Sequence, residues 1–352
     1  MNSTYADRIS LFDSRDMYNV LRDFPTQIRS GMEIGNTTDL SGIDAGSITA
    51  VLICGMGGSA ISGDILRVYS APRGRVPILV NRDYTLPRWV GRTTLVIVMS
   101  YSGETEESLS AYAEAREAGA MCIAISSGGS LLELATSDGI PAAVIPSGLA
   151  PRCALGYLLL PLLTIAARCE LLDIRQSVLT ATIADIDEVT RQLADYSDAS
   201  NTAVRIAERL HNKLPLIYGA QATLDAVVTR WRCQIQENAK TLAYSNVFPE
   251  MNHNEIVGWE QHPELLRRIA VIMLYDRDDP ERIRRRMSVT HDIIRPHPAD
   301  ILEIHANEDT QLSRIMGLIC LGDWVSFYLA IGSGVDPYPI ENIDRLKREL
   351  RT

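Results

Sequence analysis

Short apolar runs rich in β-branched residues alternate with helix-like segments through the first half of the chain. Five such runs, separated by polar helical segments, occupy residues 48–56, 75–84, 93–103, 120–129 and 141–148. Strands that alternate with helices require crossover connections, and these produce a parallel sheet covered by helices on both faces. The pattern therefore predicts an α/β fold with a doubly wound, mainly parallel sheet.

The second half of the chain repeats this pattern in a shorter form, without a residue-level repeat. Between residues 151 and 212 the strand signal vanishes and helical segments prevail. Strands then return at 213–220, 268–276 and 299–306, with a helix at 221–240 and a long apolar helix at 310–333. We therefore expect two α/β lobes with a cleft between them. The expected domains are 1–165 (an N-terminal helix plus the first domain), 166–212 (connecting helices), 213–332 (the second domain) and 333–352 (a C-terminal helical tail).

Charge and composition restrict the possible partners. The chain has 352 residues and a formal net charge of −10 at pH 7, which argues against a general nucleic-acid binder. Small anionic substrates remain possible, because a local cluster of donors can outweigh a distant negative surface. The six cysteines are widely scattered without a CxxC pair, so we expect buried free thiols.

No segment predicts export or a membrane span. The N-terminus lacks a basic start followed by an apolar core. The most lipophilic stretch, 154–172, is short for a span and is interrupted by Pro161. We expect a buried helix there, in a cytoplasmic protein with no membrane partner.

A glycine-rich turn, "GMGGSA" at 55–60, follows the first predicted strand. Such a turn suits a dinucleotide, a sugar phosphate or a purely structural role. A dinucleotide fold requires an acid at the end of the second strand, and Asp83 comes somewhat late for that position. The turn alone leaves the three possibilities open.

Hydroxyl groups crowd the loop "SYSGETEES" at 100–108, just ahead of a predicted helix. Ser100, Ser102 and Thr105, together with the N–H groups of a helix start, can cradle a phosphate. The alternative is a helix N-cap, but a cap needs only one such residue. In open α/β sheets, ligands bind beyond the carboxyl ends of the strands, where this loop and the glycine turn would both lie. The loop therefore predicts a phosphate site.

Several motifs resemble a known family. "GMGGSA", "SYSGET" and "PSGLAPRCALGYLL" resemble the sugar isomerase (SIS) domain. Together with "QENAK", "NVFPEMNHNEIVGWE" and "DPYPIENIDRLKREL", they make the chain similar to the bifunctional phosphoglucose/phosphomannose isomerases. The resemblance implies two SIS domains, a homodimer, and neither a metal nor a redox cofactor. It also implies that Gly57, Gly58 and Ser59 contact the sugar of a phosphorylated hexose.

The implied reaction is the interconversion of glucose 6-phosphate, and also mannose 6-phosphate, with fructose 6-phosphate through an enediolate. One alternative is a non-catalytic SIS-type regulator that binds a sugar phosphate. Another is an isomerase for a different phosphorylated sugar, such as the isomerase part of glucosamine-6-phosphate synthase. The chain lacks the fused glutaminase domain of that synthase and its N-terminal cysteine.

Proton transfer between C1 and C2 requires a base, a group that opens the ring, and positive charge near the oxyanion. Glu237 lies near the end of a predicted helix, whose negative pole should raise the pKa of the carboxyl group. Spacing alone favours a solvated glutamate, whereas the resemblance makes Glu237 the base. His253 matches the family's ring-opening histidine, which is contributed across the dimer interface.

Two cations complete the implied site. Arg152 matches the arginine that stabilises the enediolate, and Lys347 matches a lysine of the last helix, for which a solvated helix face is the alternative. The other histidines show no zinc-binding spacing, so no metal is expected. The basic run at 282–286 predicts a solvated helix end, in preference to the alternative of a nucleic-acid site. Tyr338 stands where the family has a threonine, and it would crowd the pocket if it lined it.

Overall fold

The computed structural model describes residues 4–350 and divides into two compact units. The N-terminal unit comprises Asp23–Asp185 with the short segment Thr310–Ser313. The C-terminal unit comprises the described residues up to Arg22, Ile186–Asp309 and the described residues from Arg314 on. Each unit contains one sheet, so the two α/β lobes expected from the sequence are present as separate bodies. The finer domain boundaries remain a prediction.

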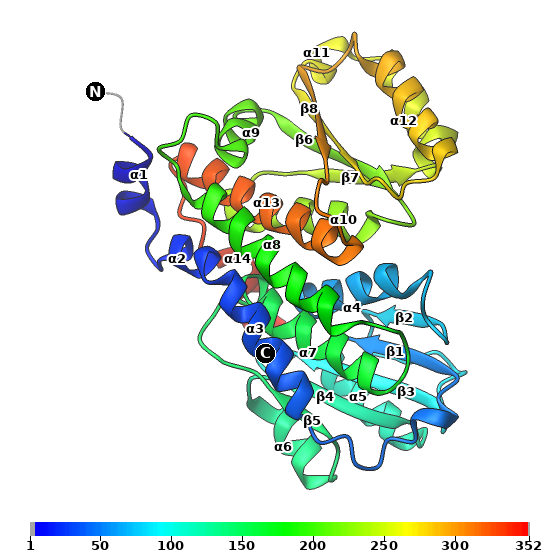
Figure 1. The fold of residues 1–352 in the computed structure, drawn as a ribbon. Coiled ribbons are helices and arrows are strands. Elements are labelled where there is room, and N and C mark those ends of the chain that lie inside the picture. Colours follow the sequence, from blue (N-terminus) through cyan, green and yellow to red (C-terminus); the bar gives the residue numbers. More distant parts are fainter. Residues whose placement is uncertain (1–3, 351–352) are drawn as a thin grey trace. The chain divides into compact units, whose positions relative to one another are not determined.

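The N-terminal unit is built on a five-stranded parallel sheet in the order β2-β1-β3-β4-β5, which can be followed in Figure 1. The strands are β1 (Ala50–Cys54), β2 (Ile78–Asn81), β3 (Thr94–Ser100), β4 (Met121–Ser126) and β5 (Ala142–Val144). The helices are α3 (Phe24–Thr37), α4 (Gly57–Ser70), α5 (Glu106–Glu117), α6 (Gly129–Ser137) and α7 (Leu155–Arg168). All five predicted strands are confirmed.

Apolar side chains cover both faces of this sheet, as expected for buried parallel strands. On one face, Leu52 and Val96 pack with Ala111 of α5 and Leu131 of α6. On the other face α4 is so close that a Cβ on Gly63 would lie 2.9 Å from Ile53. Helix α7 packs on α4, and α3 packs on α7, so the predicted buried apolar helix is confirmed as α7. The fold is therefore doubly wound.

The C-terminal unit repeats this topology with one strand fewer. Its parallel sheet has the order β7-β6-β8-β9, which matches β2-β1-β3-β4 of the first sheet. The strands are β6 (Leu214–Ala220), β7 (Tyr244–Phe248), β8 (Ile269–Tyr275) and β9 (Asp300–His305). The helices are α1 (Tyr5–Phe12), α2 (Met17–Arg22), α9 (Thr202–Leu210), α10 (Asp225–Ala239), α11 (Pro263–Leu266), α12 (Glu281–Ile294) and α14 (Glu341–Leu350).

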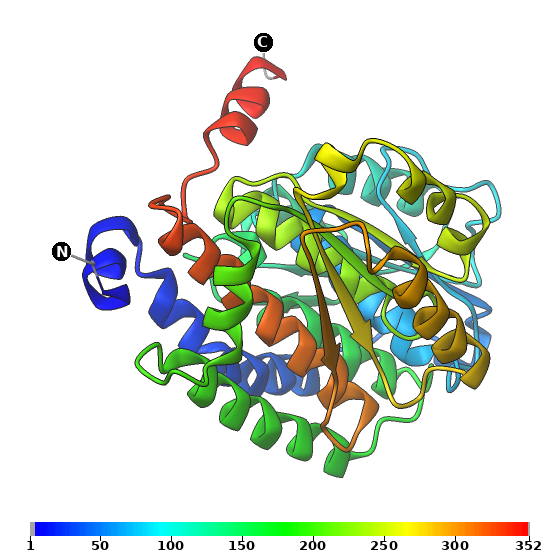
Figure 2. The same ribbon diagram turned by 90° about the horizontal axis from the view of Figure 1, so that it is seen from above.

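Two long helices cross the boundary between the units along the chain. They are α8 (Gln176–Ala194) and α13 (Gln311–Gly332). Within the C-terminal unit, α13 packs closely on α10, since a Cβ on Gly322 would come within 2.4 Å of the Trp231 indole nitrogen. By contrast, α14 has no buried residue and extends away from the rest of its unit (Figure 2).

Candidate functional site

The glycine turn lies between β1 and α4, at the point where the strand order of the first sheet reverses. Gly57 has a φ of +50°, a conformation that suits glycine, and it is exposed. Gly58 lies so close to the segment before α7 that a Cβ would be 2.7 Å from the Pro151 carbonyl oxygen. Ser59 is buried at the first turn of α4. The turn therefore lies at the switch point where ligands of open α/β sheets bind.

The hydroxyl-rich loop begins at the end of the neighbouring strand β3. The Ser100 Oγ lies 2.9 Å from the Thr105 Oγ1 and accepts a hydrogen bond of 3.1 Å from the Gly103 N–H. The Thr105 side chain does not accept a hydrogen bond from α5, although Thr105 is the N-cap residue of that helix. The simple N-cap interpretation of these hydroxyls therefore does not describe the loop.

The segment before α7 is held against both loops. The Leu149 N–H donates to the Tyr101 hydroxyl (3.0 Å), and Pro151 lies against Gly58. Arg152, in the short 3-10 turn Pro151–Cys153, is only 4% exposed. The structure therefore brings a buried guanidinium, the glycine turn and the hydroxyl loop to one edge of the first sheet.

A third loop at this edge was missed by the sequence analysis. The segment 126–130 follows β4, and its Ser127 hydroxyl donates to the Tyr101 carbonyl oxygen (2.6 Å). Gly103 approaches it so closely that a Cβ would lie 1.8 Å from the Gly128 carbonyl oxygen. The signal was present, because "SSGGS" directly follows a predicted strand, as the other two loops do.

In the C-terminal unit, Glu237 borders a hollow of about 840 Å³ at the end of α10. The hollow lies between the last turns of α10 and the chain that leads into α14. Its other lining residues are Cys233, Gln236, Lys240, Thr241, Leu242, Val335, Asp336, Pro339, Ile340, Glu341, Asn342 and Ile343. The predicted base therefore faces a cavity of the size that small-molecule sites have.

The end of α10 is fastened by Lys240, which adopts the left-handed conformation with a φ of +53°. Its ammonium group donates to the carbonyl oxygens of Glu237 (2.6 Å) and Pro337 (3.1 Å). The same side chain thereby satisfies an acceptor at the helix end and ties the helix to the tail. The backbone at Glu237 is consequently fixed relative to the wall of the hollow.

A buried polar ladder joins α10 to α13 below Glu237. The Asp323 carboxylate accepts from Arg230 Nη2 (2.6 Å) and Gln234 Nε2 (2.9 Å), and Asn238 Nδ2 donates to Ser326 Oγ (2.9 Å). Burial raises the pKa of Asp323, while the charge of Arg230 and the hydrogen bonds act in the opposite direction. The ladder therefore fixes the rotation of α10 and with it the direction of Glu237.

The remaining predicted residues of this unit lie elsewhere. His253 ends the 3-10 turn η3 (Glu250–His253) and is exposed. Lys347 lies on the exposed helix α14, four residues beyond Ile343, the last residue that lines the hollow. Tyr338 is not among the residues that line the hollow, and its ring lies 5.5 Å from the Arg15 guanidinium carbon. The ring therefore does not crowd this cavity.

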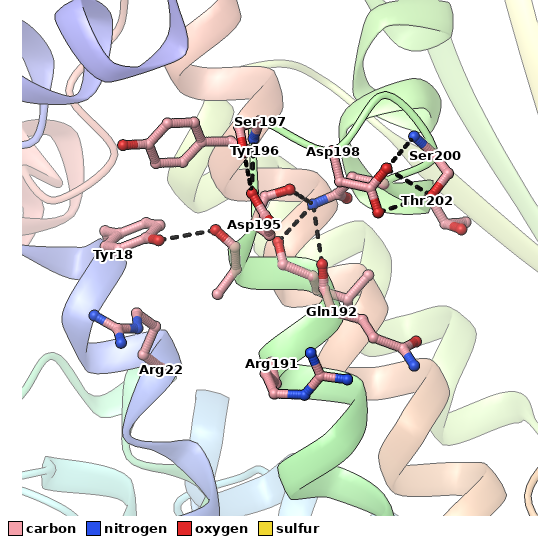
Figure 3. A pocket seen from close by; sticks show the side chains of 13 residues that line it. Tyr18, Arg22, Arg191, Gln192, Asp195, Tyr196, Ser197, Asp198, Ser200 and Thr202 are labelled. Carbon is pink, nitrogen blue, oxygen red and sulfur yellow. Dashed lines mark hydrogen bonds between the residues drawn. The ribbon is translucent and has the colours of Figure 1, made fainter.

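A second large hollow, of about 860 Å³, lies beside the end of α8 (Figure 3). Its polar groups bind one another. The Asn201 amide donates to the Leu193 carbonyl oxygen (2.9 Å), and the Tyr18 hydroxyl donates to that of Ala194 (2.8 Å). Arg191 pairs with Glu188, which leaves its charge compensated. We interpret this hollow as the capped end of a helix.

Comparison with known proteins decides the family. The chain is 42% identical to the bifunctional phosphoglucose/phosphomannose isomerase of Caldicellulosiruptor bescii, over 95% of this chain and 98% of that protein. It is 34% identical to the enzyme of the same name from Aquifex aeolicus, over 86% of this chain and 90% of that protein. This chain belongs to the bifunctional phosphoglucose/phosphomannose isomerase family. The resemblance found in the sequence is confirmed.

Two further comparisons agree with this family. Residues 199–350 match the model of the bacterial phospho-glucose isomerase C-terminal SIS domain. The fold is similar to the C-terminal domain of glucosamine-fructose-6-phosphate aminotransferase from Francisella tularensis, with a TM-score of 0.69 and 13% identity. That match covers 91% of this chain and 97% of the other. At this identity it supports the SIS fold alone.

Three other features of the chain bear on its chemistry. Helix α13 is long and apolar enough to cross a membrane, but 89% of its apolar window is buried inside the protein, as in a core helix. Across residues 4–350, no group of three or more His, Cys, Asp or Glu side chains could hold a metal ion. None of the six cysteines forms a disulfide, and five of them are buried, as expected. Cys233, the sixth, lines the hollow beside Glu237.

Proposed function

We propose that this family member interconverts glucose 6-phosphate and mannose 6-phosphate with fructose 6-phosphate through an enediolate. One structural observation supports the proposal independently of the family match. The glycine turn, the hydroxyl loop and the buried Arg152 meet at the carboxyl edge of the first sheet. This arrangement suits a phosphorylated sugar, because it combines neutral donors with a desolvated positive charge.

The phosphate is assigned to Ser100, Ser102 and Thr105. Their hydroxyls precede the first turn of α5, whose N–H groups and dipole favour an anion. Gly57, Gly58 and Ser59 contact the sugar, since the exposed turn at Gly57 lets a ligand approach the main chain closely. The sugar phosphate is therefore oriented before any proton moves.

Glu237 is assigned as the base that moves a proton between C1 and C2. Its place beside a cavity, on a helix end held by Lys240 and the buried ladder, supports this role. Arg152 is assigned to the developing oxyanion, because a buried guanidinium stabilises negative charge more strongly than an exposed one. Lys347 is assigned to the site on the family resemblance.

His253 is assigned to ring opening in the partner's site of a homodimer. Its exposure on η3 supports a role toward a second subunit, since the side chain is available at the surface. An imidazole suits the task because one ring nitrogen can accept a proton while the other donates one. The exposed apolar side chains of α14 (Ile343, Leu346 and Leu350) are also consistent with a subunit contact. The expected cytoplasmic location and the absence of a cofactor remain predictions.

A coupled assay that measures fructose 6-phosphate tests the activity with each aldose in turn. We expect turnover of both, and substrate should slow alkylation of Cys233, which borders the same hollow as Glu237. Binding without turnover would instead identify a sugar-phosphate sensor. Turnover of neither aldose, with turnover of another phosphorylated sugar, would assign a different isomerase.

Mixed dimers test the shared site. Glu237→Gln and His253→Ala should each be nearly inactive, but exchange of subunits should create dimers in which one of two sites holds both native residues. Statistical mixing makes about half of the dimers mixed, so roughly a quarter of the wild-type sites would return. No recovery after proven subunit exchange would place His253 in the site of its own chain.

A further inference from the structure

The basic run of α12 is solvated, with Arg282 and Arg285 exposed and Arg286 half-buried, but it also borders a hollow. Arg282, Arg285 and Arg286 border a hollow of about 360 Å³ between α12 and the 3-10 turns η3 and η4 (Glu255–Glu260). Their spacing of i, i+3 and i+4 puts the three guanidiniums on one helix face. Ile256 and Val289 supply apolar walls. The expected solvated helix end is therefore present, and it also forms one wall of this hollow.

The charges of this hollow are uncompensated. In the part of the chain that the structure describes, none of the three guanidiniums forms an ion pair, and no acid lines the hollow. Arg284 differs, because its charge acts on the buried Asp279. Like charges at this spacing repel one another, so the helix face is stabilised when an anion binds. The hollow is a local positive region on a chain with a net charge of −10.

A second polar feature points to a hydroxyl-bearing ligand. The Asn252 side chain lines the hollow and donates to the Thr290 hydroxyl (2.8 Å), but its Oδ1 is buried without a hydrogen-bond partner. A buried acceptor without a donor is costly, and such groups usually have a partner. Phosphate oxygens carry no donor for it, whereas a ligand hydroxyl can donate once the half-buried Asn252 side chain turns toward the hollow.

We propose that this hollow is a second anion site, which binds a small phosphorylated metabolite carrying a free hydroxyl. A phosphate monoester has a charge of about −1.5 to −2 at neutral pH, which matches several guanidiniums. The planar guanidinium fork binds phosphate oxygens in pairs. The volume falls within the usual range of ligand sites, about 300–1,000 Å³. The site belongs to the C-terminal unit, whereas the phosphate cradle of the substrate belongs to the other.

Calorimetry with glycerol 3-phosphate tests the proposal on the full-length protein. This probe carries a phosphate and two hydroxyls but has no carbonyl to isomerise. We expect more than one binding event per wild-type chain. Arg285→Gln with Arg286→Gln should weaken one event at least about tenfold and leave the other unchanged. The matched control is Arg284→Gln on the same helix, which removes one charge without touching the hollow.

A second readout locates the bound probe. Hydrogen exchange of the segment 250–256 should slow when glycerol 3-phosphate binds, and the double variant should lose this protection. Equal weakening by Arg284→Gln would reduce the effect to net charge and overturn the site. A single binding event that the double variant retains would also overturn it. Loss of the dimer in the double variant, with both binding events retained, would assign the arginines to a subunit interface instead.

Discussion

At the ends of β1 and β3, the first sheet presents glycines and hydroxyls, whereas in the second sheet the matching end of β6 is followed by the Thr223 hydroxyl and that of β8 by carboxylates. In the first sheet, the Ser100 and Thr105 hydroxyls lie 2.9 Å apart and are surrounded by main-chain groups. In the second, the Thr223 hydroxyl that follows β6 donates to the Asp279 carboxylate that follows β8. The two strand ends are thereby bonded to each other instead of being left for a ligand.

A buried arginine completes the carboxyl edge of the second sheet. We call this the second edge, and the carboxyl edge of the first sheet the first edge. Arg314 of α13 is 1% exposed and donates to Asp276 at 2.8 Å, and it also pairs with Asp278. The acids that surround it would repel a phosphate, and the guanidinium already has its anionic partners. Two sheets of the same topology thus differ in the chemistry of this edge because of a few loop residues. We infer that the first edge binds substrate phosphate, while the second edge stabilises the fold.

The largest expected effect concerns Glu237, to which our proposal assigns proton transfer in the C-terminal unit, whereas it assigns phosphate binding to the N-terminal unit. Glu237→Gln should lower kcat by roughly 10³-fold or more and leave sugar-phosphate binding nearly intact. Proton exchange at C2 measured by NMR checks the assignment. If the variant still exchanges that proton, some other residue is the base.

Removal of Arg314 should have the next largest effect, and on stability alone. Arg314→Met leaves Asp276 buried without its cation, which should lower the free energy of unfolding by about 3–5 kcal/mol. Arg345→Met is the control, since its pair with Glu349 is exposed and should contribute less than about 1 kcal/mol. Urea unfolding gives both values. A raised KM in Arg314→Met at normal stability would show that the second edge also binds substrate.

Ser102→Ala should act in the opposite way, on binding and not on stability. We expect KM to rise about tenfold with kcat changed less than about threefold, because phosphate binding is shared by ground and transition states. The matched variant is Thr223→Val at the second edge, which should lose about 1–2 kcal/mol of stability and keep its KM. Equal KM values for Ser102→Ala and wild type would remove the phosphate assignment.

Local sequence predicted most of this architecture. The strands were found because each is a short apolar run bounded by turn residues, and the hydroxyl loop was found because its residues are neighbours in the sequence. The exception is β7, an edge strand whose Ser245 and Asn246 are half-buried and polar, so its sequence lacks the apolar signal.

Contacts between distant segments could not be predicted in the same way. The bond from Leu149 to the Tyr101 hydroxyl and the approach of Gly103 to Gly128 depend on how the loops meet above the sheet. One residue of the polar ladder that orients α10 can be recognised in the sequence. Asp323 stands in the apolar run "GLICLGDWVSF", where an acid requires a buried partner. Only the packing of α13 on α10 identifies that partner as Arg230.

The smallest expected effect is a pH dependence of stability that belongs to the second edge alone. Burial raises the pKa of Asp279 from its ordinary value of 3.8, and the charge of Asp276 acts in the same direction. The hydrogen bonds from Thr223 and the Asp276 N–H, and the charge of Arg284, act against this shift. The folded state therefore binds this proton more tightly than the unfolded chain does. Its contribution to stability is present at low pH and is lost as the pH rises through the folded pKa.

Asp279→Asn removes this titration while Asp276, Asp278, Arg284 and Arg314 stay in place. Unfolding free energies of the variant and the wild type, measured between about pH 3.5 and 7, give the difference directly. We expect the wild type to lose stability relative to the variant as the pH rises through that window, and the difference to become flat above it. Ser100→Ala at the first edge should give a flat difference throughout, because a hydroxyl does not titrate there. A flat difference for Asp279→Asn would mean that the carboxyl group titrates alike in both states, and the electrostatic contrast between the two edges would then fail.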